Sequence, residues 1–87
     1  KSASAHWVRD VEVVLLTAYP GWTKHYVFLS STPLTCQWAE PTNAVMHFSQ
    51  ASSGGEAVLS MVTTALVSKR KVDIHANGCE IFEIYLK

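Results

Sequence analysis

Large aromatic side chains are the residues of this chain best suited to binding a ligand. The 87 residues include three tryptophans, three tyrosines and three phenylalanines. Exposed aromatic rings stack on sugar rings or on nucleic-acid bases, and they also anchor protein interfaces. Tyr19 and Trp22 flank a Pro-Gly turn, which predicts that both rings are exposed on a loop. The other interpretation is that these rings, with Trp7 and Trp38, fill the ends of a hydrophobic core.

Residues that could perform catalysis do not fall in a recognised spacing. Asp10 and Glu12 share one face of a predicted strand and could act as an acid–base pair, but a solvated strand edge is the simpler explanation. The Gly54-Gly55 pair precedes a helix without the rest of a phosphate-binding motif. The histidines lack the paired spacing of zinc sites and are scattered singly: His6, His25, His47 and His75. We therefore expect no enzyme activity, no catalytic residue and no metal or other cofactor.

The two cysteines, Cys36 and Cys79, are far apart and match no C-x-x-C spacing. A disulfide between them would close a long loop, which stabilises a small domain most. We predict this bond, and with it a secreted protein, extracellular or periplasmic; the alternative is two buried thiols in a cytosolic protein. The segment Ala3-Ser4-Ala5 has the A-x-A pattern of a signal-peptide cleavage site, although it could also be a polar tail.

Composition limits the size of the fold and its partners. The length predicts one domain over residues 1–87, with 1–5 as a loose tail. Lys and Arg together number seven, as do Asp and Glu, so the net charge is zero. Because binding to phosphates by charge alone requires an excess of cations, we expect no nucleic-acid partner. No apolar run approaches the length of a membrane helix, so we also expect no membrane insertion.

Hydrophobic periodicity predicts a mainly β fold with one helix. Alternating or continuous apolar residues indicate strands over 6–17, 23–30, 34–38, 71–76 and 81–87, with a short β-like segment over 44–49. The first two strands form a hairpin, and a helix over 56–69 separates the third strand from the last two. This order, β-β-β-α-β-β, is that of the OB-fold, a five-stranded Greek-key barrel.

The predicted helix has two uncharged faces. One face has the i, i+3, i+4, i+7 spacing of a core-facing stripe, from Val58 to Leu66, and Ser53 and Glu56 have the spacing of a capping box. The other face consists of Leu59, Thr63 and Val67, and no charged residue occurs between Ala57 and Ser68. Either this second face packs on other copies of the chain, or its Thr and Ser residues supply enough polarity for contact with water.

The last two strands are joined at an Asn-Gly sequence, which strongly favours a hairpin. A three-residue loop over 77–79 would pair Ile74 with Phe82 and Val72 with Ile84, because register follows the buried face. This register leaves Cys79 at the bend, free to reach Cys36. It directs three side chains of the last strand into the core: Phe82, Ile84 and Leu86.

The segment from the helix onwards resembles the B subunits of the subtilase-cytotoxin, pertussis and typhoid toxin group. The resembling residues are MVTTALVSKRKVDIH at 61–75, Asn-Gly-Cys at 77–79 and the apolar final strand. The earlier residues resemble the group in element order only. The resemblance implies a secreted OB-fold subunit in a homopentameric ring with the helices at its centre. It also implies binding to cell-surface glycans, often sialylated, and a separate catalytic A subunit.

The resemblance also suggests which residues form the sites. The group's sugar sites use a serine near the first strand, and Arg9 stands at the aligned position here. With the exposed-aromatic interpretation, the candidate glycan-binding residues are Arg9, Tyr19, Trp22, Trp38 and His75. The helix face of Leu59, Thr63 and Val67 is the candidate oligomer interface. Two other functions stay open: an OB-fold module that binds single-stranded nucleic acid by stacking and the basic cluster 69–71, and a secreted oligomeric domain without sugar binding.

Overall fold

The computed structural model describes residues 5–31 and 44–87. Within these ranges the chain is mainly β with one helix, in the predicted order. The predicted strand 34–38 and the site residues Cys36 and Trp38 lie outside the described residues, and the third described strand is the segment predicted as short and β-like. Ala5 belongs to a strand and not to the predicted loose tail. The elements are β1 (Ala5–Leu16), β2 (Lys24–Leu29), β3 (Ala44–Ser49), α1 (Gly55–Ser68), β4 (Lys71–Asn77) and β5 (Glu80–Leu86).

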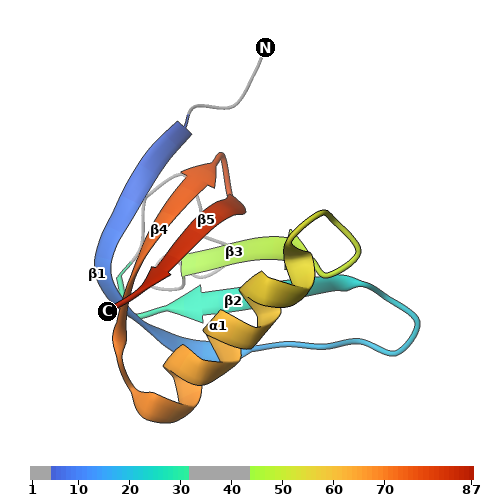
Figure 1. The fold of residues 1–87 in the computed structure, drawn as a ribbon, viewed down its shortest axis with the longest axis horizontal. Helices are drawn as coiled ribbons and strands as arrows, with labels where there is room; N and C mark the ends of the chain where they lie inside the picture. Colours follow the sequence, from blue (N-terminus) through green and yellow to red (C-terminus); the bar gives the residue numbers. More distant parts are fainter. Residues whose placement is uncertain (1–4, 32–43) are drawn as a thin grey trace.

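The five strands hydrogen-bond in a closed ring in the order β1-β2-β3-β5-β4, with β4 returning to β1. β1 is long enough to pair with β4 through its first half and with β2 through its second half (Figure 1). The predicted hairpin of the first two strands is thereby confirmed. β3 and β5 run parallel and meet at His47 and Glu80, where the His47 amide donates to the Cys79 carbonyl at 2.9 Å.

Two irregularities in β1 break the alternation expected from the sequence. The pairing with β4 shifts between Val8 and Val11, where Asp10 adopts a left-handed backbone with φ of 58°. Because such a bulge adds one residue, Val8 and Val11 both point into the core. A second shift lies between Val13 and Leu15, so that Leu15, which strict alternation would place on the same face as Val13, is instead 45% exposed.

The predicted register of β4 and β5 is wrong. Ile74 lies opposite Ile84 and Asn77 opposite Glu80, with a shift between His75 and Ala76. The turn is therefore made by residues 78–79, and a bulge after it turns two successive residues of β5 away from the core. As a result Phe82, predicted to be buried, is 66% exposed, while Ile81 takes the inward position.

The core lies inside the strand ring and under α1, which packs on β1, β3 and β5. Val62 and Ala65 of α1 are fully buried, and Val58 and Leu66 pack against the same core, as the helical spacing predicted. The buried apolar residues are Val8, Val11, Val13, Val27, Leu29, Val45, Met46, Phe48, Val62, Ala65, Val72, Ile74, Ala76 and Ile81. No helix among the described residues is long and apolar enough to cross a membrane.

The start of α1 differs from the predicted capping box of Ser53 and Glu56. The residue before the helix is Gly54, with φ of 79° and no side-chain cap hydrogen bond. The chain turns sharply after β3, and Gly55 is buried against the end of that strand; a Cβ there would lie 2.8 Å from the Gln50 Cα. The glycine pair therefore begins the helix because the turn requires a left-handed residue followed by one without a side chain.

Candidate functional site

Three side chains form a row across the outer face of β1, β4 and β5. Trp7 lies opposite His75, and His75 lies opposite Glu83. The Trp7 and His75 rings stack with centroids 4.6 Å apart and an interplanar angle of 15°. Tyr85, two residues along β5, brings its ring to 5.6 Å from Trp7. This face therefore carries a packed aromatic cluster, although Trp7 and Tyr85 are 41% and 49% exposed.

The β1 bulge places Arg9 on this cluster. Its guanidinium carbon lies 4.3 Å from the centroid of the Trp7 ring, which is a cation–π distance. The same guanidinium approaches the Asp73 carboxylate, with Arg9 Nη1 at 3.5 Å from Asp73 Oδ2. Without the bulge, strict alternation would not turn both Arg9 and Asp10 outward, so the bulge builds this edge of the site.

Several charged residues beside the aromatic cluster hold the β1 bulge in place. The Asp10 backbone amide donates to Asp73 Oδ1 at 2.8 Å, and the Lys87 ammonium forms ion pairs with both Asp10 and Asp73. The hydrogen bond from Asp10 is the main reason why the pKa of Asp73 lies below its ordinary value, and Lys87 and Arg9 add to this effect. The Lys87 pKa is raised, chiefly by its hydrogen bond to Asp10.

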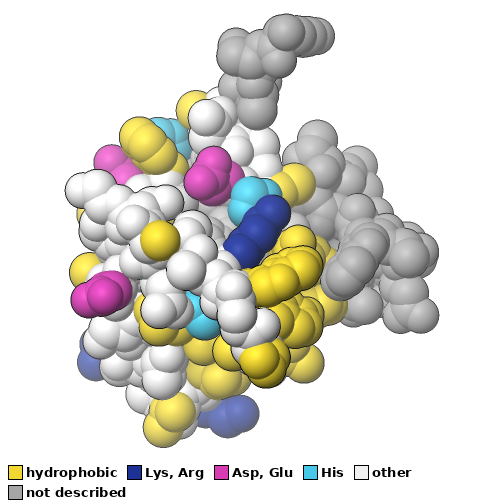
Figure 2. All heavy atoms as spheres, turned by 90° about the vertical axis from the view of Figure 1, so that its right-hand side faces the viewer, with side chains coloured by type: hydrophobic (Ala, Val, Ile, Leu, Met, Phe, Trp, Pro, Cys, Tyr) yellow, Lys and Arg dark blue, Asp and Glu magenta, His cyan; other side chains and the backbone are white. Residues whose placement is uncertain are grey.

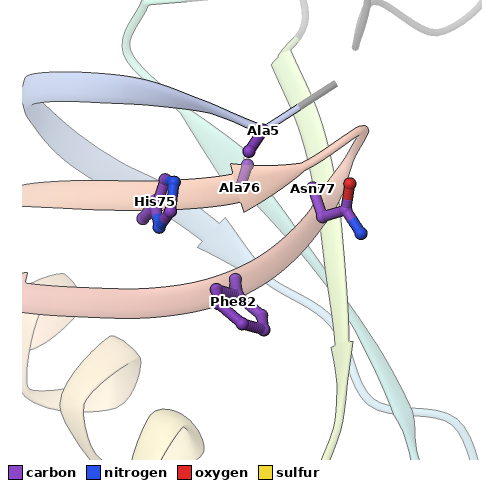
Figure 3. Close-up of a pocket in the computed structure, with 5 residues that line it drawn as sticks. All are labelled: Ala5, His75, Ala76, Asn77 and Phe82. Carbon is purple, nitrogen blue, oxygen red and sulfur yellow. The ribbon is translucent and has the colours of Figure 1, made fainter. Parts of the chain in front are cut away.

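A pocket of about 180 Å³ opens at the end of the row. Figure 3 shows its walls: Ala5 from β1 on one side, the end of β4 in the middle and Phe82 of β5 on the other side. Phe82 is the most exposed ring of the cluster, and its edge-to-face contact with His75 joins the pocket to the aromatic row, with centroids 5.7 Å apart. The lining residues are Ala5, His75, Ala76, Asn77 and Phe82.

Few polar groups lie at the pocket. Asn77 contributes an amide, which both donates and accepts hydrogen bonds. His75 Nδ1 is buried, makes no hydrogen bond to the described residues and lies 3.7 Å from Glu83 Oε1. The same Glu83 oxygen accepts from the Tyr85 hydroxyl at 2.9 Å, which raises the Tyr85 pKa. An apolar ring beside an amide and an imidazole can bind a small ligand with one apolar face and several hydroxyl groups.

The predicted glycan-binding residues fall into two groups. Arg9 and His75 both contact the Trp7 ring. Tyr19 and Trp22 lie instead on the loop between β1 and β2, with their rings 5.7 Å apart and Trp22 61% exposed. The loop prediction for these two rings is thus confirmed, but they do not line the pocket.

The second aromatic group continues from the loop onto the outer face of β2 and β3. Tyr26 lies 6.2 Å from Tyr19 and 6.1 Å from His47, and the Lys24 ammonium is 5.3 Å from the Tyr26 ring centroid. Burial, followed by the charge of Lys24, lowers the His47 pKa, whereas Glu80 acts in the opposite direction. Figure 2, viewed from the side of this loop, shows hydrophobic side chains gathered beside a basic side chain and a histidine.

The outer face of α1 is uncharged, as the sequence indicated. Val67 is 76% exposed and Thr63 is exposed, whereas Leu59 is half-buried and packs against the core. Three hydroxyl groups of this helix donate to carbonyl groups one turn earlier: Thr63 to Leu59 at 2.8 Å, Thr64 to Ser60 at 2.9 Å and Ser68 to Thr64 at 2.6 Å. Because these donors are already bonded within the helix, burying this face would not leave them unpaired.

Cys79 is in a disulfide bond, and it lies at the β4–β5 turn between Asn77 and Phe82 of the pocket. Its predicted partner Cys36 lies outside the described residues, so the pairing stays a prediction. The Cys79 carbonyl also accepts the hydrogen bond from His47 that joins β3 to β5. The turn that supports one wall of the pocket is therefore held by a hydrogen bond to β3 and by the disulfide bond of Cys79.

Sequence reasoning missed most of the pocket. The sequence favours a core position for Trp7, predicts Phe82 in the core and identifies Asn77 only as a turn residue. The one available signal is at His75, which occupies an outward position in the predicted alternation of its strand; strict alternation places Trp7 on the face of Val11 and Val13, and the β1 bulge turns it outward. The two bulges that expose Arg9 and Phe82 leave no clear mark in the sequence.

Comparisons with known proteins add no identification: no protein-family model matches the chain, and no curated protein matches its sequence.

Proposed function

We propose that this chain is a secreted OB-fold subunit that assembles into a ring through α1 and binds cell-surface glycans in the pocket formed by His75, Asn77 and Phe82. A homopentamer that delivers a separate catalytic subunit is the form suggested by the resemblance to toxin B subunits. The observation that carries the proposal is the pocket itself, where an open aromatic ring adjoins an amide and a half-buried imidazole.

The strand arrangement supports the OB-fold assignment. The ring order β1-β2-β3-β5-β4, with α1 between β3 and β4, fits a five-stranded barrel of Greek-key type. In OB-folds the loops that join β1 to β2 and β4 to β5 are common places for ligand binding, including oligosaccharides. The pocket adjoins the β4–β5 turn, where Asn77 and Phe82 flank residues 78–81.

The chemistry of the pocket suits a single sugar ring. Sugars present apolar C–H faces that stack on aromatic rings, and Phe82 offers such a surface with 66% of its area exposed. Sugar hydroxyl groups both donate and accept, so they suit the Asn77 amide, which lines the pocket. Arg9, held over Trp7 at the end of the row, would attract an acidic substituent of a neighbouring sugar.

The outer face of α1 supports self-association. Val67 exposes three-quarters of its surface on a helix in which the hydroxyl groups of Thr63, Thr64 and Ser68 are bonded internally. A face that is uncharged and already satisfied in its hydrogen bonds can be buried at low desolvation cost. We therefore assign Thr63 and Val67 to the subunit interface. Leu59 contributes to this interface and also packs against the core.

Two measurements test the proposal. A glycan array should give selective binding for the wild-type protein, and Phe82→Ala should abolish it, whereas Trp22→Ala on the β1–β2 loop should not. Light scattering should give a solution mass that is a multiple of the 9.6 kDa chain. Binding that requires Trp22 and not Phe82 would move the sugar site to the other aromatic group, and a monomer without array binding would contradict the proposal.

A further inference from the structure

We propose that the arm formed by residues 13–23, which leads from the end of β1 to the start of β2, docks on the zwitterionic surface of a phosphatidylcholine membrane. The contact is peripheral: the tip of a loop lies among lipid headgroups, and no segment spans the bilayer. It is independent of the glycan pocket, which is on β1, β4 and β5.

The arm is uncharged and unusually apolar on its surface. No charged residue occurs between Glu12 and Lys24. Of the eight large hydrophobic residues that are exposed in the described ranges, four belong to the arm: Val14 at 58%, Leu15 at 45%, Tyr19 at 41% and Trp22 at 61%. Figure 1 shows that the loop between β1 and β2 extends beyond α1 and β3, so its tip can reach a flat surface first.

The tip holds its two aromatic rings in a defined arrangement. The Trp22 amide donates to the Tyr19 carbonyl at 3.1 Å, and Gly21 supplies the positive φ of 82° that this tight turn requires. The Tyr19 and Trp22 rings contact each other at 5.7 Å with an interplanar angle of 59°. Rings that are already positioned lose little conformational entropy on binding.

The base of the arm is anchored, so the tip projects from a fixed support. The Thr17 amide donates to the Tyr26 carbonyl, and the Tyr26 amide donates to Thr17 Oγ1, both at 2.9 Å. The Thr17 carbonyl lies 2.8 Å from Nδ1 of His25, a buried ring that stacks on Phe48 of the core. These contacts fix the arm so that Tyr19 and Trp22 are exposed in the folded protein.

The chemistry of the tip favours a zwitterionic lipid headgroup. Tryptophan and tyrosine concentrate at membrane interfaces because each combines an apolar ring with a polar group. The faces of such rings attract quaternary ammonium groups such as choline. The Lys24 ammonium, near Tyr26 at the base of the arm, can pair with the phosphate of the same headgroup. Binding to an anionic surface would require a cluster of cations, which the arm does not have.

The exposed area is also better suited to a membrane than to another protein. At roughly 150–250 Å² for a fully exposed large side chain, the two rings at the tip expose on the order of 200 Å². A stable protein interface buries about 800 Å² on each partner, so the arm alone is too small. Binding to a lipid surface requires no such minimum area, since each inserted apolar side chain adds separately to the binding free energy.

Flotation with phosphatidylcholine vesicles that contain no glycolipid tests the proposal apart from sugar binding. We expect the wild-type protein to float with the vesicles and Trp22→Ala to lower the partition coefficient by about tenfold or more. Phe82→Ala is the matched control, because it removes an equally exposed ring outside the arm and should float like the wild type. Trp22→Phe should retain most of the binding, which shows that any loss in Trp22→Ala is not due to misfolding.

Three outcomes would overturn the proposal. The wild type could fail to float with phosphatidylcholine, or it could float only with anionic phosphatidylglycerol vesicles, which would indicate attraction by charge. Trp22→Ala could also float as well as the wild type. If Trp22→Ala instead lowered the solution mass without changing flotation, the arm would be a subunit contact. None of these results depends on glycan binding, since the vesicles carry no sugar.

Discussion

Phe82→Ala is the perturbation whose effect the structure defines most sharply. Phe82 is two-thirds exposed, so about 130 Å² of a ring with roughly 200 Å² of surface is available to a ligand. A sugar that stacks on one face covers about half of this area. At about 25 cal/mol per Å², the lost contact weakens binding by about 1.6 kcal/mol, which is roughly fifteenfold in Kd.

The same substitution should change stability little, because only a third of the ring is covered in the folded chain. Calorimetric titration of the best ligand from a glycan array measures the change in Kd, and thermal melting confirms that the variant is folded. Trp22→Ala serves as the control and should leave the Kd unchanged. A folded Phe82→Ala protein whose Kd stays within twofold of the wild-type value would refute the assignment of this ring to the sugar site.

Three further predictions address the bulge, the helix start and the assembly. Because the pKa of Asp73 is lowered in the fold, its carboxylate stabilises the protein above the ordinary value of 3.8, and this contribution is lost as the pH falls below it. Asp73→Asn should therefore lower the urea midpoint at pH 7 and reduce its dependence on pH between 7 and 3; an unchanged pH dependence would disprove this role. Gly55→Ala should destabilise the fold by about 1–3 kcal/mol in urea unfolding, because its Cβ would press on the Gln50 backbone, and a neutral effect would show that the turn can relax. Val67→Glu should lower the mass measured by light scattering without lowering the melting temperature, since Val67 is 76% exposed; an unchanged mass would exclude Val67 from the interface.

The order of elements could be predicted because it depends on periodicity. The stripe of Val62 and Ala65 was enough to place α1 within one residue at each end. The short β-like segment at 44–49 coincides with β3. These features follow from which residues face the core, and a sequence displays that directly.

The details that build the site could not be predicted, because they depend on single inserted residues. A bulge shifts every later side chain by one position, and neither Asp10 nor Phe82 has a residue type that marks one. The predicted capping box is wrong for a related reason. The sharp turn after β3 requires a left-handed residue before the helix, and this residue is Gly54 instead of Ser53. Strand parity turns His75 outward, but it places Trp7 on the face of Val11 and Val13 and buries Phe82, the ring that opens the pocket.

The two contacts that we propose, with a glycan and with a lipid surface, use two separate aromatic groups. The pocket on β1, β4 and β5 suits a sugar, and the arm of residues 13–23 suits the lipid beneath it. Because they share no residue, each can be removed separately, by Phe82→Ala or by Trp22→Ala. A protein that used both would bind vesicles with glycolipid more tightly than vesicles or sugar alone.

The most direct test of the central claim is an NMR titration of the ¹⁵N-labelled protein with the best monosaccharide ligand. The Trp7 and Trp22 indole N–H signals and the Asn77 side-chain amide report on the two aromatic groups in one experiment. If sugar binds in the pocket, the Asn77 amide and the Trp7 indole should shift, while the Trp22 indole stays in place. A shift of the Trp22 indole with Asn77 and Trp7 unchanged, or no shift at all, would contradict the account.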